Sequence, residues 1–163
     1  MKQLWAPWRL EYVSSSKEEK GCVFCIPDST EEDDDRYIIH RGNTAFVIMN
    51  RFPYTNGHLM VTPYRHCGSI DDLNEDEVLE IHRLLVLARQ ALAGTSRPDG
   101  FNIGVNLGRS AGAGIPKHVH YHMVPRWSGD TNFMTIFGEV RVIPEHLEAT
   151  FQRLKTEFAR LIK

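Results

Sequence analysis

The stretch His118-Val119-His120-Tyr121-His122 alternates three histidines with two residues that favour β-strands. Side chains alternate between the two faces of a strand, so the three imidazoles are expected to leave one face together. The residues between them, with Met123, would then pack into a core on the other face. The pattern predicts a strand that carries chemistry on one side and is buried on the other.

A glycine-rich segment, residues 108–114, runs in just before this strand. Backbone N–H groups in such a segment can approach a phosphate closely, because no side chain holds the ligand away. A neutral imidazole is a competent nucleophile near pH 7, so we expect His120 to attack phosphorus and His122 to assist. The non-bridging oxygens would be bound by the backbone of Gly112, Ala113 and Gly114.

Histidines in this pattern also suit a metal ion, so their spacing leaves a catalytic metalloenzyme open. Cys22-Val23-Phe24-Cys25 has the spacing by which two thiolates reach one zinc ion, and three cysteines do not favour a disulfide framework. His66 and His118 would complete a closed structural zinc site with this pair and leave His120 free. Cys67 is an alternative ligand, although adjacent residues in an extended segment point in different directions.

Length and composition indicate one soluble domain. The 163 residues are 42% hydrophobic and 25% charged, with a formal net charge of −2, which gives no broad surface for a nucleic acid polymer. No apolar run approaches the roughly 20 residues that a membrane span needs, and the N-terminus has no signal-peptide pattern. We therefore expect a cytoplasmic protein that does not associate with a membrane.

Alternating and helical patterns complete an α+β domain. Strands are expected at residues 36–40, 44–49, 58–63 and 101–106, with a turn at residues 41–43. A long helix is expected to begin after the cap Asn74 and to end at Gly94, and a last helix is expected to begin near Pro144. Their apolar stripes are Val78, Ile81, Leu84, Leu85, Ala88 and Leu92 in the first, and Leu147, Phe151, Leu154, Phe158 and Leu161 in the second.

The histidine stretch, followed by Met123 and Val124, resembles the signature of the histidine triad (HIT) family of nucleotide hydrolases and transferases, and residues 50–63 are similar to another family block. The resemblance implies an antiparallel sheet of about five strands with one long packed helix, a C-terminal helix and usually a homodimer. It implies a nucleotide substrate, with His120 as the nucleophile. Residues placed around the substrate are Asn50 at the ribose, Asn106, His118 and His122 at the phosphates, and His58 and Ser110.

Both ends of the chain extend the resemblance. Leu4-Trp5-Ala6-Pro7-Trp8-Arg9, residues 106–112 and Pro125-Arg126-Trp127 look like the bacterial diadenosine tetraphosphate phosphorylase branch of the family. This implies that Trp127 contacts substrate, and the cysteine pair with His66 and His118 resembles the zinc-binding members. We therefore expect a single domain with an arm at residues 1–20, a core at about 21–127 and an extension at 128–163.

Two departures bear on the reaction. The common hydrolases carry a glutamine where this chain has Gly114, and the phosphorylases carry Gly-Ser in place of Ala113-Gly114. We expect cleavage of a phosphoanhydride in a dinucleoside polyphosphate or related nucleotide through nucleotidyl-His120, with phosphorolysis slightly favoured over hydrolysis. Ser110 would supply the missing hydroxyl. The alternative is a zinc-stabilised nucleotide-binding module with little turnover.

Overall fold

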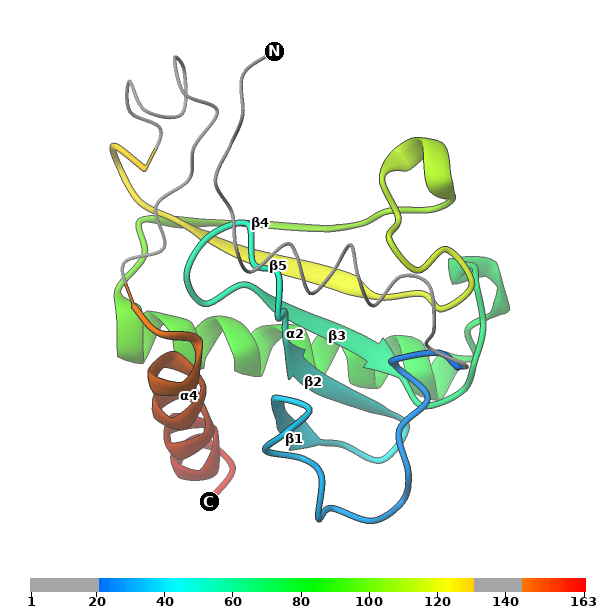
Figure 1. Cartoon of the computed structure of the whole chain (residues 1–163), viewed down its shortest axis with the longest axis horizontal. Coiled ribbons are helices and arrows are strands. Elements are labelled where there is room, and N and C mark those ends of the chain that lie inside the picture. The colour runs from blue at the N-terminus through cyan, green and yellow to red at the C-terminus, as the bar shows by residue number, and fades with distance from the viewer. Residues whose placement is uncertain (1–20, 131–144) are drawn as a thin grey trace.

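A five-stranded antiparallel sheet lies at the centre of the computed structural model, which describes residues 21–130 and 145–163. The predicted arm and part of the predicted extension fall outside these ranges. The strands run in the order β1-β2-β3-β5-β4 (Figure 1), and the fold confirms the predicted α+β architecture. The elements are β1 (Ile38–Arg41), β2 (Ala45–Met49), β3 (Leu59–Pro63), η1 (Ile70–Asp72), α2 (Glu75–Ser96), β4 (Gly100–Val105), η2 (Arg109–Ala111), β5 (Tyr121–Arg126) and α4 (Leu147–Leu161).

Both long helices cover the same face of the sheet. Helix α2 packs on β2, β3 and β5, and α4 packs on α2 and β1, so that α2 lies behind the sheet in Figure 1. Alternate strand residues, such as Val47, Val61 and Met123, fill the core between the sheet and these helices. The opposite face carries a smaller apolar cluster that includes Met60, which pairs in register with His122. The chemistry-bearing face is therefore the one that the helices leave open.

Strand β5 begins later than the histidine pattern predicts. It starts at Tyr121, so His122 is the one member of the triad inside a paired strand. The segment before it is held instead through Val119, whose N–H donates to the Cys67 carbonyl (2.7 Å) and whose carbonyl accepts from the Thr62 hydroxyl (2.8 Å). These bonds replace the strand ladder and continue its extended path.

Helix α2 begins as predicted. The Asn74 side chain accepts a hydrogen bond from the Glu77 N–H (2.9 Å), and the Glu77 carboxylate accepts one from the Asn74 N–H (2.9 Å). This reciprocal pair satisfies two of the backbone donors that a helix start leaves open. Arg65 forms an ion pair with the same carboxylate (2.7 Å), which ties the loop after β3 to the start of the helix.

Two predictions about α2 are wrong. The helix continues past Gly94 to Ser96 and is ended by Arg97, which adopts the left-handed conformation (φ 46°). Gly94 lies against α4, where a Cβ would come within 2.7 Å of the Glu157 carboxylate and displace that side chain. Val78 was placed on the buried stripe but is 51% exposed on the outer side of the helix. Within the described ranges, no helix is long and apolar enough to cross a membrane.

Glu80 of α2 holds the turn between β1 and β2. Its carboxylate accepts hydrogen bonds from the N–H groups of Asn43 (2.8 Å), Thr44 and Ala45 (3.1 Å). Burial opposes ionisation, but the hydrogen bonds outweigh it and lower the pKa of Glu80 below its ordinary value. The helix thus fixes the position of a hairpin that the sequence pattern defines only locally.

We expect Glu80→Gln to lower the free energy of unfolding at pH 7 by about 1–3 kcal/mol, measured by urea denaturation, because it removes an anionic acceptor. Since the folded-state pKa is lowered, this contribution is present above the unfolded pKa of about 4.3 and is lost as the pH falls. Wild type and variant should therefore converge as the pH falls through the lowered folded-state pKa of Glu80. Glu75→Gln, on an exposed residue of the same helix, should change stability by less than about 0.5 kcal/mol; a pH-independent difference would contradict the assignment.

Candidate active site

His120 presents a nucleophilic nitrogen. Its Nδ1 lies 2.8 Å from the backbone carbonyl oxygen of His118. A carbonyl only accepts, so Nδ1 carries the hydrogen and Nε2 keeps its lone pair. Burial lowers the pKa of His120, outweighing the opposite effect of the bond to His118, and the ring is neutral near pH 7. The site therefore provides an imidazole already in the form that attacks.

His122 has the opposite tautomer. The Tyr54 N–H donates to Nδ1 of His58 (3.1 Å), so His58 carries its hydrogen on Nε2. That Nε2–H donates to Nδ1 of His122 (2.9 Å), which leaves the hydrogen of His122 on Nε2. Burial and the neighbouring His120 lower the pKa of His122 to about 4, so it is a neutral hydrogen-bond donor near pH 7.

The two rings meet edge to face, with centroids 4.9 Å apart and an interplanar angle of 74°. A lone pair on one imidazole and an N–H on the next suit attack on phosphorus with a donor beside the departing oxygen. Tyr54, which the sequence interpretation left out, is 43% exposed, and its ring centroid lies 4.7 Å from that of His58 and 5.9 Å from that of His122. Its position in the loop after β2, four residues before His58, is the sequence signal that could have identified it.

Two predicted substrate residues support the site from behind. His58 is fully buried, so the prediction that it binds substrate directly needs correction: it reaches the site through His122. The Asn50 amide Nδ2 lies 3.3 Å from Nδ1 of His58, and its Oδ1 accepts from the Phe52 N–H (2.9 Å). Asn50 thus orders this loop, and its contact with a ribose stays a prediction.

The glycine-rich loop is folded back on itself. The N–H of Gly112 donates to the Arg109 carbonyl (3.0 Å), and that of Ala113 donates to the Gly108 carbonyl (3.2 Å). Two of the amides that are predicted to meet a phosphate, those of Gly112 and Ala113, are therefore already used in this conformation, and the phosphate contact stays a prediction. Gly112 has φ +90°, and a Cβ there would lie 3.8 Å from the Asn106 amide, which brings Asn106 to the rim of the loop.

Two further residues, Ser110 and Trp127, are predicted to contact substrate. Ser110 is exposed within η2. Trp127 follows the far end of β5, where its indole N–H donates to the Ser96 carbonyl (3.2 Å). Four residues of β5 separate it from His122, so the two are five steps apart, about 16 Å at the usual rise per residue. The structure does not bring Trp127 to the cluster, and its predicted contact would need a substrate of that length.

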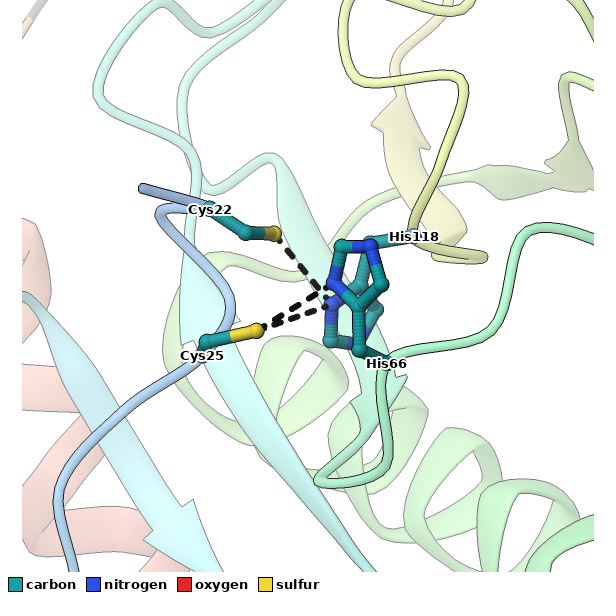
Figure 2. Close-up of side chains that lie close together, drawn as sticks. All are labelled: Cys22, Cys25, His66 and His118. Carbon is teal, nitrogen blue, oxygen red and sulfur yellow. Dashed lines mark hydrogen bonds between the residues drawn. The ribbon is translucent and has the colours of Figure 1, made fainter. Parts of the chain in front are cut away.

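A second cluster joins four metal-binding side chains, whose donor atoms all lie within 4.8 Å of one another. Figure 2 shows Cys22, Cys25, His66 and His118 pointing toward one centre. Nδ1 of His118 lies 3.3 Å from the Cys22 sulfur, and Nδ1 of His66 lies 3.3 Å from the Cys25 sulfur. The group is the one predicted from sequence, and the alternative ligand Cys67 does not belong to it.

The donor set fits a zinc ion. Nε2 of His118 donates to the Pro63 carbonyl (2.9 Å), which leaves Nδ1 with a lone pair facing the sulfurs. Burial and the adjacent Cys22 raise the pKa of the Cys25 thiol, a cost that a bound dication would offset. Because both ring nitrogens of His118 are engaged, its predicted contact with phosphate needs correction. Its carbonyl, which orients His120, is the part that serves the active site.

Comparisons with known proteins agree with this geometry. A family model for the HIT domain matches residues 30–129. The chain is 38% identical over 167 residues to AP-4-A phosphorylase of Mycobacterium tuberculosis, which covers 98% of this chain and 86% of the relative. A zinc-bound histidine triad family protein from Mycobacterium smegmatis matches the fold with a TM-score of 0.68 at 26% identity, over 87% of this chain and 96% of that one. A hypothetical histidine triad nucleotide-binding protein from Sulfolobus tokodaii gives 0.66 at 25% identity, over 86% and 93%.

Proposed function

This chain belongs to the HIT domain family, and from that premise we propose that it cleaves a phosphoanhydride of a dinucleoside polyphosphate by nucleotidyl transfer through His120. The observation that carries the proposal is the pair of opposite tautomers. His120 keeps a lone pair on Nε2, and His122, whose ring contacts it, carries an N–H on Nε2. A relative named AP-4-A phosphorylase supports diadenosine tetraphosphate as the substrate to test.

In the first step, Nε2 of His120 attacks the α-phosphorus, and the bond from that phosphorus to the bridging oxygen breaks. The electron pair of that bond leaves with the oxygen of the departing nucleotide, where the Nε2–H of His122 can donate a hydrogen bond as charge develops. The phosphorylated imidazole keeps its hydrogen on Nδ1 and gains positive charge. The His118 carbonyl, 2.8 Å away, stabilises that charge.

In the second step, an acceptor attacks the same phosphorus and the bond to His120 breaks, which returns the neutral imidazole. We propose inorganic phosphate as the favoured acceptor. Gly114 has no side chain that could position a water molecule, and among the described residues no backbone acceptor meets its N–H. That amide can bind an anion, and the named phosphorylase relative supports the same choice.

Incubation with diadenosine tetraphosphate separates the reactions by product. We expect ATP and ADP when phosphate is present, because phosphate accepts the nucleotidyl group, and slow release of ATP and AMP when it is absent. His120→Ala should lower kcat at least about 10³-fold, since the nucleophile is lost. His82→Ala, at an exposed histidine of α2, is the control and should keep full activity. AMP as the main product at saturating phosphate would contradict the acceptor, and full turnover by His120→Ala would contradict the mechanism.

The metal cluster favours a second candidate, a zinc-stabilised nucleotide-binding module with little turnover. It differs from the enzyme in two measurable ways. The module predicts nucleotide binding that His120→Ala leaves unchanged and no nucleotidyl adduct by intact-protein mass spectrometry. The enzyme predicts an adduct that acid treatment removes and that His120→Ala abolishes.

We also propose that the four-residue cluster holds a structural zinc ion, in which two thiolates and two imidazoles complete a tetrahedral site. Metal analysis of the purified protein should give about one zinc per chain. Cys25→Ser should lose most of that zinc, because it removes a thiolate ligand, whereas Cys67→Ala should keep it. Equal zinc loss in both variants, or a zinc-free wild type, would contradict the site.

A homodimer is proposed from the free edge of the sheet. Strand β4 is at the edge, and Ile103 within it and Leu107 just after it are 51% and 41% exposed. Light scattering should give twice the chain mass of 18.7 kDa. Ile103→Lys should shift the protein toward the monomer, because it places a charge on the pairing edge; a monomeric wild type would contradict the proposal.

A further inference from the structure

Phe24 connects the zinc cluster to the nucleophile. It lies between the two ligand cysteines and is 2% exposed. Its ring centroid is 4.8 Å from that of His120 at an interplanar angle of 39°, and 5.4 Å from that of His118 at 67°. One side chain therefore touches a metal-cluster histidine and the attacking histidine at once.

The His120 ring needs such a contact. One hydrogen bond, from Nδ1 to the His118 carbonyl, fixes the position of that one ring atom of the imidazole. Nε2 must stay free for the proposed attack. Packing must therefore fix the plane of the ring. Phe24 lies against it at 39°, while His122 contacts it edge to face. Loss of the Phe24 ring would remove this contact and leave the plane of His120 less firmly held, by the hydrogen bond and the edge contact with His122.

The position of Phe24 depends in turn on the turn formed by residues 22–25. The Cys25 N–H donates to the Cys22 carbonyl (3.0 Å), and no helix or strand includes this segment. Two anchors hold it within the described structure. One is the cluster of cysteine and histidine donors, and the other is the burial of Phe24 among Ile38, Phe46, Ile48 and Met60.

We propose that Phe24 is a positioning residue, through which the zinc-binding turn holds the ring of His120 in its attacking orientation. A bound ion would fix the two cysteines, the cysteines fix Phe24, and Phe24 fixes the plane of the imidazole. The turn thus does more than join the N-terminal segment to the sheet. The consequence for rate rests on the proposed nucleotidyl transfer, but the consequence for ring order does not.

The test compares Phe24→Leu with Phe46→Leu. Both remove an aromatic ring from the same buried cluster, but Phe46 stacks on Tyr64 at 5.3 Å. We expect Phe24→Leu to lower kcat for diadenosine tetraphosphate about 10- to 100-fold with KM changed less than about 3-fold, because misorientation affects attack more than binding. Phe46→Leu should keep kcat within about 3-fold. Phe24→Met, which preserves more volume, replaces Phe24→Leu if the latter does not fold.

Ring order is measured independently of turnover by ¹⁵N NMR of the histidine side chains at fixed pH. Wild-type His120 should show a single Nδ1–H tautomer, and Phe24→Leu should show averaging toward the Nε2–H form. Cys25→Ser, which keeps Phe24 but removes a metal ligand, should reproduce that averaging, and Phe46→Leu should not. If wild type turns over no nucleotide, the proposed function fails, and these spectra alone then decide whether Phe24 orders the ring of His120. A single His120 tautomer in Phe24→Leu, or the same change in Phe46→Leu, would overturn the inference.

Discussion

The hydrogen bond from Nδ1 of His120 to the carbonyl of His118 is the constraint on which the site depends. It decides which nitrogen can attack, and it requires the backbone at His118 to be held in one orientation. Three hydrogen bonds hold that orientation. The His118 ring donates to the Pro63 carbonyl at the end of β3, the Val119 N–H donates to the Cys67 carbonyl, and the Val119 carbonyl accepts from the Thr62 hydroxyl. The end of one strand therefore positions the segment that enters another.

Side chains alternate between the two faces of the sheet, so the main apolar core lies on one face and the histidines of the site lie on the other. One face is buried under α2 and α4, and its apolar residues supply most of the core. The other face buries His58, His118 and His120 beside a smaller apolar cluster. Burial there is tolerated because each of these imidazoles has a hydrogen-bond partner. The same burial keeps His120 and His122 neutral, which a nucleophile and an adjacent donor both require.

Local patterns in the sequence were sufficient for the architecture. Alternation predicted the strands, the Asn74 and Glu77 pair predicted the start of α2, and the cysteine spacing with His66 and His118 predicted the metal cluster. The errors concern properties that depend on distant partners. Gly94 lies inside the helix against Glu157 of another helix, and the amides of Gly112 and Ala113 are occupied by carbonyls that a sequence does not orient. The sequence does not show that β3 pairs with β5. The burial of His58 behind His122, which arises from that pairing, therefore could not be predicted.

The histidine tautomers could not be predicted from the sequence either. They explain why His118, His120 and His122 are proposed to have different roles. Spacing makes the three imidazoles equivalent, but each has a different neighbour: Pro63 for His118, the His118 carbonyl for His120 and His58 for His122. Only His120 keeps a lone pair directed away from its hydrogen bond and outside the metal cluster. The proposal that His120 is the nucleophile therefore rests on main-chain and side-chain partners that the fold brings together. The Tyr54 N–H fixes the tautomer of His58, the partner of His122, so the loop after β2 determines which nitrogen of His122 can donate. The turn of residues 22–25 contacts the proposed nucleophile through Phe24.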